Sequence, residues 1–178
     1  MHTWKTIFAT ALLSLTACAE AGVDRPDDAG ASAIGAYEPT DTEKAEVVAT
    51  LQWLFDALRA GDEALLRSVV DASVVMHYSE TLDGRTTLGS STLDALATRI
   101  TSSEVPLIER LWDPIVVVDG PLATIWTPYD FYAGQAFSHC GVDAANLMRT
   151  DDGWKIVALA WTRRQPPDCA LHPGGPPS

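Results

Sequence analysis

The sequence predicts an α+β fold in which a cone-like, bent antiparallel sheet of four to six strands wraps around a long N-terminal helix. Two observations lead to this expectation. Apolar residues recur at helical spacing early in the segment 41–164, and β-rich stretches separated by turn signals fill its second half. A long sheet that bends strongly can cover the helix and leave a cavity on its concave face. Residues 41–164 are therefore expected to form one domain.

The first helix is expected to begin after Thr40, because Thr40-Asp41-Thr42-Glu43 fits a capping box. One apolar face follows at helical spacing, formed by Val47, Leu51, Leu54, Phe55 and Leu58. Gly61 is the expected C-cap of this helix, and Asp62 is the expected N-cap of a shorter second helix. Ser91 is expected to cap a third helix.

Strands are expected at residues 73–78, followed by a turn at 82–85, and then throughout the second half of the domain. The dipeptide Asp119-Gly120 is a strong hairpin signal. Around it, β-rich stretches predict further strands at 107–112, 115–118, 122–132, 137–149 and 154–163.

The N-terminal residues have the features of a lipoprotein signal peptide. Residues 1–17 carry Lys5 and then an uncharged, mostly apolar run that is too short to span a bilayer. They lead into Leu15-Thr16-Ala17-Cys18, which resembles a bacterial lipobox and implies lipidation of Cys18. Several acyl chains would anchor the protein stably to a lipid bilayer, with the outer membrane favoured in a Gram-negative cell. Ordinary cleavage that leaves Cys18 as a free thiol is the alternative.

The segments that flank the domain differ from it in composition. Residues 18–40 are rich in Ala, Gly, Asp and Pro and predict a flexible tether, and residues 165–178 predict an irregular Pro/Gly-rich tail. The whole chain has a formal net charge of −12. Nucleic acids and anionic membrane surfaces attract clustered Lys and Arg, so neither is an expected partner of such an acidic chain.

The order of the expected elements resembles the nuclear transport factor 2-like superfamily of cone-shaped α+β barrels. Within it, the second half of the chain is similar to the bacterial lumazine-binding-like and polyketide-cyclase-like branch. The resemblance covers about residues 41–164 and is carried by Trp126, Pro128-Tyr129-Asp130-Phe131-Tyr132, Ser138-His139-Cys140-Gly141-Val142-Asp143 and Asp152-Gly153-Trp154-Lys155-Ile156. It implies the fold, but it does not select a reaction, because this fold hosts many chemistries.

Asp130 and His139 are the candidate catalytic residues. A hairpin that turns at Gly134-Gln135 places them directly opposite each other, and one that turns at Ala133-Gly134 places them diagonally on one face. Their Cβ atoms would then lie within about 5–8 Å of each other. A carboxylate beside an imidazole raises the imidazole pKa and fixes its tautomer, which suits general acid–base catalysis. A purely structural cross-strand pair is the alternative.

Five residues are candidates for the wall of a ligand pocket: Trp53, His77, Trp126, Tyr129 and Tyr132. On the expected strand 122–132, Trp126 and Tyr132 share one face with Asp130, while Tyr129 lies on the other. Alternation alone does not decide which face lines the cavity. A cone lined by Trp and Tyr would suit a flat hydrophobic ligand, although the same aromatic residues would also suit a core.

With Cys18 lipidated, Cys140 and Cys169 remain, and an exported pair is expected to form a disulfide if Pro166-Pro167 turns the chain back. Two separate thiols and a nucleophilic Cys140 are the alternatives. No metal site is predicted, because the sequence has no H-x-x-x-H or C-x-x-C spacing. No cofactor is predicted either, since a Gly-rich phosphate-binding loop is missing.

Three functions remain open on the sequence alone. The first is a lipid-anchored protein of the cell envelope that binds a small organic ligand in its cone. The second is a cofactor-independent isomerase, dehydratase or cyclase, with Asp130 and His139 as acid–base groups and Tyr129 or Tyr132 as an oxyanion donor. The third is a structural or assembly lipoprotein, with a possible homodimer formed through the convex face of the sheet.

Overall fold

The computed structural model describes residues 37–177 and contains three helices and seven strands in that range. The helices are α1 (Asp41–Ala60), α2 (Glu63–Val69) and α3 (Leu93–Ser102). The strands are β1 (Val75–Leu82), β2 (Arg85–Thr92), β3 (Leu107–Leu111), β4 (Ile115–Asp119), β5 (Leu122–Ala133), β6 (Ala136–Thr150) and β7 (Gly153–Arg163). The expected signal peptide at 1–17, the lipidation site at Cys18 and most of the expected tether lie outside the described residues. Among the described helices, none is long and apolar enough to cross a membrane.

The boundaries of α1 and α2 follow from their capping residues. Thr40 forms the expected capping box, because its Oγ1 accepts from the Glu43 N–H at 3.2 Å and its own N–H donates to Glu43 Oε2 at 2.9 Å. Gly61 ends α1 in the left-handed conformation with φ 67°, where a side chain would be strained. Asp62 then caps α2 by accepting from the Leu65 N–H. For α3 the cap is Thr92, one residue after the expected Ser91.

The sheet has the order β2-β1-β7-β6-β5-β3, and β4 also pairs with β5. This confirms the α+β class with a sheet that bends around the first helix, but two details of the expectation were wrong. The sheet has seven strands, and the pairing of β1 with β7 is parallel. The expectation missed β2, because its residues are mostly polar and exposed.

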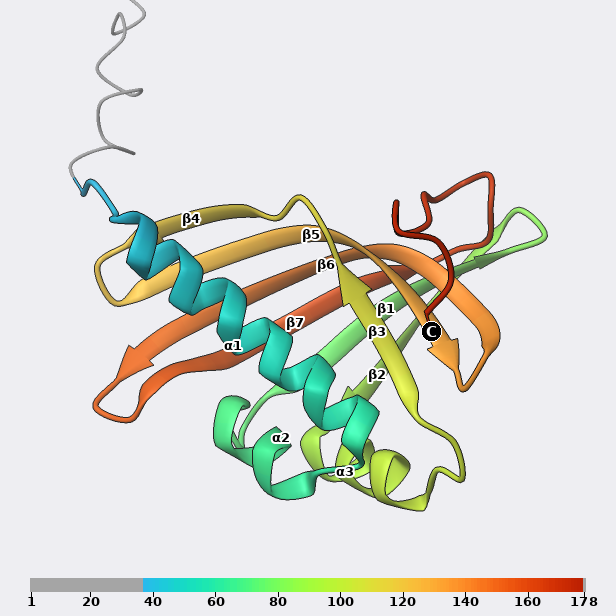
Figure 1. Ribbon diagram of the computed structural model, residues 1–178, viewed down its shortest axis with the longest axis horizontal. Coiled ribbons are helices and arrows are strands. Elements are labelled where there is room, and N and C mark those ends of the chain that lie inside the picture. Colours follow the sequence, from blue (N-terminus) through green and yellow to red (C-terminus); the bar gives the residue numbers. More distant parts are fainter. Residues whose placement is uncertain (1–36, 178) are drawn as a thin grey trace, which may run out of the picture. The chain divides into compact units, whose positions relative to one another are not determined.

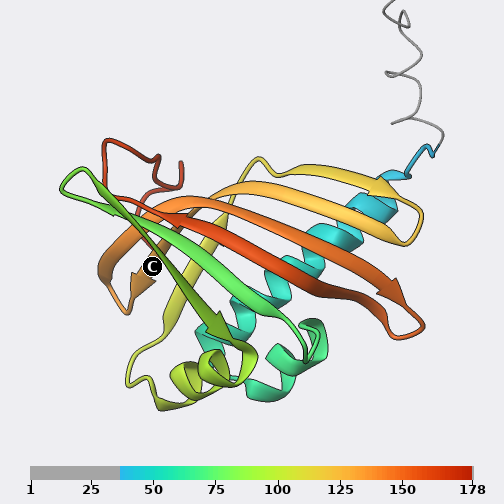
Figure 2. The ribbon, with the colours of Figure 1, turned by 180° about the vertical axis from the view of Figure 1, so that it is seen from behind.

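The sheet curves around α1, which crosses its concave face, while α2 and α3 lie at one end of the helix (Figure 1). Seen from behind, no described helix covers the opposite, convex face (Figure 2). On β5 the concave side bears Ala123, Ile125, Thr127, Tyr129 and Phe131, all of them buried. The apolar face of α1 packs on this side of the sheet, so the core lies between the helix and the concave face.

A β-bulge in the β5–β6 hairpin decides which side chains face inward. Near the turn, Tyr132 pairs with Phe137, but the next pair is Phe131 with His139, so Ser138 has no partner across the ladder. Asp130 consequently pairs with Cys140. The expected pairing of Asp130 with His139 is therefore wrong. One inserted residue turns His139 to the concave face, while Asp130 faces the convex side.

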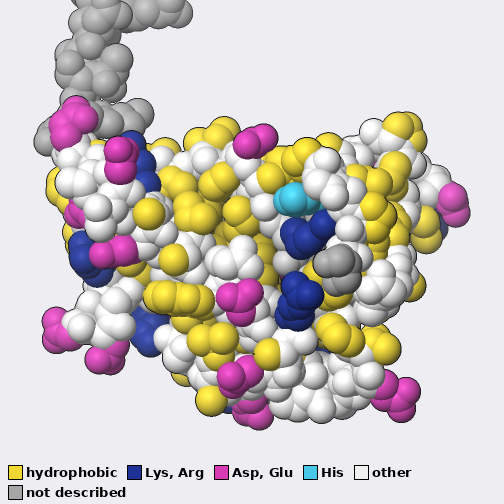
Figure 3. Space-filling model, viewed as in Figure 1, with side chains coloured by type: hydrophobic (Ala, Val, Ile, Leu, Met, Phe, Trp, Pro, Cys, Tyr) yellow, Lys and Arg dark blue, Asp and Glu magenta, His cyan; other side chains and the backbone are white. Residues whose placement is uncertain are grey.

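The C-terminal tail folds back over this convex side. Cys169 forms a disulfide with Cys140, with their Cα atoms 5.8 Å apart. Arg110 binds the fully buried Asp130 with two hydrogen bonds of 2.9 and 2.6 Å and also donates to the Gly175 carbonyl at 2.7 Å. The His172 N–H donates to Asp130 as well, at 3.0 Å. Figure 3, in the view of Figure 1, shows a histidine side chain (cyan) next to Lys or Arg side chains (dark blue) on this part of the surface. Asp130 thus joins β5, β3 and the tail.

An Asp130→Ala substitution is expected to destabilise the protein by about 3 kcal/mol, because it leaves the Arg110 guanidinium without its carboxylate. Urea denaturation measures the effect, with Asp152→Ala in the exposed turn before β7 as the matched control. A cost below about 1 kcal/mol for Asp130→Ala would contradict this structural role.

Candidate functional site

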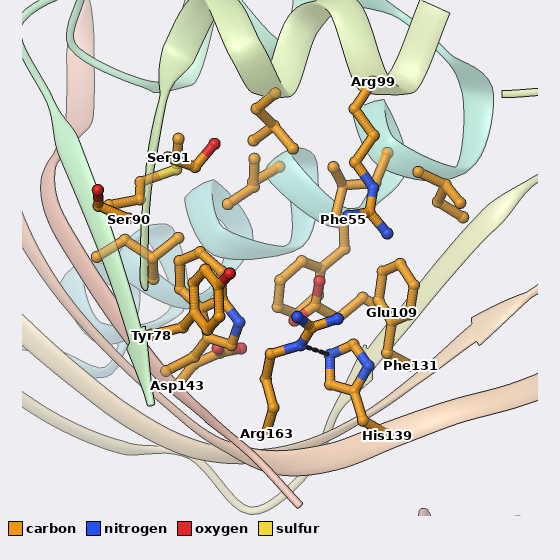
Figure 4. A pocket seen from close by; sticks show the side chains of 17 residues that line it. Phe55, Tyr78, Ser90, Ser91, Arg99, Glu109, Phe131, His139, Asp143 and Arg163 are labelled. Atoms are coloured by element: carbon orange, nitrogen blue, oxygen red, sulfur yellow. Dashed lines mark hydrogen bonds between the residues drawn. The ribbon is translucent and has the colours of Figure 1, made fainter. Parts of the chain in front are cut away.

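A cavity of about 220 Å³ lies between α1, α3 and the concave face of the sheet (Figure 4). Its apolar wall consists of Leu54, Phe55, Leu58, Met76, Leu96, Leu107, Phe131 and Leu159. Its remaining lining residues carry polar atoms: Tyr78, Ser90, Ser91, Arg99, Glu109, His139, Asp143, Trp161 and Arg163. Such an apolar enclosure with a few converging polar groups is the usual form of a small-molecule site.

Two carboxyl groups meet in this cavity, Glu109 from β3 and Asp143 from β6. Burial raises the pKa of Glu109 well above its usual value, and the neighbouring Asp143 carboxylate raises it further. Burial also raises the pKa of Asp143, and the hydrogen bond from Glu109 partly offsets that effect. Both observations point to Glu109 as the protonated member, which donates to Asp143. The pair therefore shares one proton near neutral pH.

His139 lies in the same cavity as a neutral imidazole. Its Nε2 accepts from Arg163 Nε–H at 3.3 Å, and its Nδ1 lies 2.9 Å from the Ser138 hydroxyl. Its ring stacks on Phe131, with centroids 5.0 Å apart. Burial, followed by the charges of Arg163 and Arg99, lowers the pKa of His139 to about 3. The accepting nitrogen of His139 is already bound to Arg163, so His139 positions Arg163 and does not act as a base toward a ligand.

The two arginines of the cavity have different surroundings. Arg163 donates to His139, lies 3.5 Å from Glu80 Oε1, and stacks its guanidinium over Tyr78 at 5.1 Å. Arg99 reaches toward the cavity from α3, with its guanidinium 6.0 Å from the centre of the Phe131 ring. Its side chain forms no ion pair with any carboxylate of residues 37–177. A fixed positive charge therefore stands unpaired at the cavity.

Tyr129 packs against His139, with ring centroids 5.7 Å apart, and its hydroxyl has a structural partner. Its hydroxyl donates to the Thr162 carbonyl at 2.8 Å, and burial is the largest cause that raises its pKa. The Thr162 carbonyl comes so close to Gly141 that a Cβ there would lie 1.9 Å from the oxygen. Only glycine fits at that position. Tyr129 is therefore a neutral donor that is already engaged, and not a free oxyanion donor.

The other residues expected at the ligand pocket do not line the cavity. Trp53 is 49% exposed on the outer side of α1. His77 and Trp126 line a shallow groove on the convex face, and Trp126 is 52% exposed. Tyr132 is buried on the convex side, where the Arg110 guanidinium lies over its ring. The face of β5 that bears Trp126 and Tyr132 turned out to be the convex one, so these expectations were wrong.

Of the expected site residues, only His139 lines the cavity. The sequence reasoning missed Glu109, Asp143 and Arg163 as functional candidates. Asp143 carried a usable signal, because it lies four residues after His139 on the same strand and therefore on the same face. Glu109 likewise lies two residues after the buried Leu107 on β3, and therefore on the same face. Their meeting depends on the long-range pairing of β3 with β5, which no local pattern reveals.

The shared proton predicts a pH-dependent stability. A folded-state pKa above the unfolded value stabilises the fold below the unfolded pKa, and this contribution is lost as the pH rises through the folded one. Relative to a Glu109→Gln/Asp143→Asn double variant, the protein should lose stability from pH 4.5 toward pH 7. Because the pKa values of both carboxyl groups are raised, the folded protein can bind up to two more protons than the unfolded chain, which limits the slope to about 2.7 kcal/mol per pH unit. Urea denaturation across this range measures it.

The comparison with the double variant is needed because His139 acts in the opposite direction. Its lowered pKa stabilises the folded protein above pH 6.5, and this contribution is lost as the pH falls toward 3. His139 is present in both proteins, so its contribution cancels. Parallel pH profiles for the two proteins would contradict the shared proton.

No protein-family model and no curated protein matches the chain. Solved structures do match. A proposed aromatic ring hydroxylase from Novosphingobium aromaticivorans superposes with a TM-score of 0.58 at 15% identity, over 72% of this chain and 94% of the other. A nuclear transport factor 2-like superfamily protein from Salmonella enterica gives a TM-score of 0.56 at 16% identity, over 72% and 96%.

A third match is a proposed dehydratase of the nuclear transport factor 2-like family from Streptomyces avermitilis. It superposes with a TM-score of 0.54 at 21% identity, over 70% of this chain and 98% of the other. Similarity at these levels of identity speaks for the arrangement of the elements and not for a shared activity. The chain therefore has the nuclear transport factor 2-like fold.

Proposed function

We propose that the domain binds a small organic molecule built around a single ring in the cavity beneath α1. The observation that carries this proposal is the mixed lining of the cavity, in which apolar side chains surround a proton-sharing carboxyl pair and an unpaired arginine. An apolar cavity of about 150 Å³ holds benzene. The larger volume of about 220 Å³ suits a ring with one or two polar substituents.

Proton transfer on that ligand is a second candidate function, favoured by the Glu109–Asp143 pair. The pair contains one acid and one base in a single apolar site, which is the requirement for moving a proton between two atoms of a substrate. Asp143 would accept the substrate proton, and Glu109 would donate its proton to a second substrate atom. One protein of this fold is named as a proposed dehydratase, and dehydration is a reaction that acid–base groups catalyse, which fits such chemistry without assigning it.

We also infer a location for the protein from its N-terminal sequence, as part of the same proposal. A lipobox-like sequence ending at Cys18 would anchor the domain to the cell envelope, with residues 19–40 as the tether. The disulfide between Cys140 and Cys169 is of the kind that persists in oxidising compartments, which supports export. A structural or assembly role, with a homodimer formed through the convex face, is the alternative. The exposed Trp126 on that face favours it.

Filling the cavity should abolish ligand binding. A Ser91→Phe substitution places a ring beside Met76, on the inward face of β2. Protein purified from its own envelope is expected to carry a small molecule in native mass spectrometry, and the Ser91→Phe variant is expected to lack it. Thr98→Phe, on an exposed position of α3 outside the cavity, is the matched control and should retain the molecule. A ligand that survives Ser91→Phe, or no ligand in any of the three proteins, would contradict the proposal.

Lipidation should depend on Cys18 alone. Cells fed with labelled palmitate are expected to label the protein, and a Cys18→Ser variant is expected to remain unlabelled and to leave the membrane fraction. Cys169→Ser is the matched control, since it removes a cysteine from the disulfide and should leave the label in place. Equal labelling of Cys18→Ser and the unchanged protein would exclude the anchor.

A further inference from the structure

Two charged groups of the cavity, one positive and one negative, are incompletely paired within the described residues. One is the guanidinium of Arg99, which forms no ion pair with the described carboxylates. The other is the Asp143 carboxylate: its Oδ2 is buried and receives no hydrogen bond from a described N–H or hydroxyl group, which leaves the Glu109 carboxyl as the donor beside it. Arg163 is paired, because it contacts both His139 and Glu80, and the protonated Glu109 is neutral and donates to Asp143.

The Asp143 carboxylate can accept a further hydrogen bond, so a ligand group beside it should be a donor. The Asp143 side chain is 2% exposed, so water does not freely replace the missing partner. A buried acceptor that lacks donors destabilises the site, and more so when it carries charge. A hydroxyl or N–H group on a ligand would remove this cost. A ligand acceptor or anion at the same place would be repelled by the carboxylate.

Arg99 favours a ligand group that accepts hydrogen bonds and carries negative charge. Its side chain is exposed and comes from the last turn of α3, so it stands where the cavity opens. The guanidinium presents several donors in a planar fork that matches a carboxylate with two parallel hydrogen bonds. Its nearest aromatic contact is the Phe131 ring, which leaves the polar edge of the guanidinium available for a ligand. Figure 4 shows Arg99 reaching toward the cavity from the side opposite Asp143.

We propose that the ligand is a small ring acid. Its carboxylate would bind Arg99, and the opposite end of the ring, which enters the cavity first, would carry a hydroxyl or N–H donor that binds Asp143. This inference rests on the proposed function, because it names the ligand class of the same cavity. The ring itself would lie among apolar lining residues such as Phe55, Phe131 and Leu54. A neutral apolar ligand would leave both polar groups unpaired, and a cation would meet the charge of Arg99.

Three probes of nearly equal shape test the assignment in isothermal titration calorimetry with the full-length protein. They are 4-hydroxybenzoate, with both groups; benzoate, which lacks the donor; and 4-hydroxybenzamide, which lacks the charge. Each missing group should weaken binding about tenfold, because each one removes a hydrogen bond to a charged group. The order expected is therefore 4-hydroxybenzoate above the other two.

Two variants assign the preferences to residues. Arg99→Gln should remove the preference for 4-hydroxybenzoate over the amide, and Asp143→Asn should weaken the preference for 4-hydroxybenzoate over benzoate. Arg59→Gln, on an exposed position of α1 outside the cavity, is the matched charge control and should leave both preferences unchanged. Equal effects of Arg99→Gln and Arg59→Gln would show that only the overall charge matters, which would overturn the assignment.

The failure of this inference is distinguishable from the failure of the proposed function. If a small molecule co-purifies and is lost in Ser91→Phe, but 4-hydroxybenzamide binds as well as 4-hydroxybenzoate or no probe binds, the ring-acid assignment is overturned and the binding cavity stands. If neither a co-purified molecule nor a probe binds, both are overturned.

Discussion

The arrangement of the site depends on one inserted residue, Ser138, in the hairpin between β5 and β6. Without this bulge the pairing set by the turn would continue, and Asp130 would lie opposite His139. With it, His139 and Asp143 face the concave side while Asp130 and Cys140 face the convex side. The same residue thus separates two polar clusters that have different tasks. One fastens the tail, and the other forms the inner wall of the cavity.

The two clusters treat buried charge in opposite ways. Asp130 is fully buried but receives hydrogen bonds from both Arg110 and the His172 backbone, so its charge is matched and its place is fixed. Asp143 is also buried, but no described N–H or hydroxyl group donates to its Oδ2, and the carboxyl group of Glu109 is the donor beside it. A matched charge stabilises a fold, whereas an unmatched one is usually kept for binding or chemistry.

Local sequence signals were sufficient to predict the helices and the turns. The capping box at Thr40 and the glycine at position 61 set the ends of α1 through contacts within a few residues, so the sequence alone could place them. The same holds for the turn at Asp119-Gly120 between β4 and β5. β2 was not predicted, because its residues are mostly polar. The tertiary fold sets its pairing with β1 and the parallel pairing of β1 with β7.

The site was less predictable for a related reason. Which face of β5 turns inward depends on how the whole sheet curves around α1, and the period of two is the same for both faces. The bulge at Ser138 has no marker such as glycine at the inserted residue. Glu109 and Asp143 lie on strands that are separated by β5 in the sheet, and they meet only because the sheet is strongly bent. Such contacts follow from curvature, which a single sequence does not display.

A crystal structure of the protein purified from its own envelope would test the central claim most directly, because it locates a bound molecule without assuming what it is. The account predicts ring-shaped density in the concave cavity, with an acidic group against Arg99 and a donor against Asp143. Density in the convex groove beside Trp126, or a concave cavity filled by protein side chains, would contradict it.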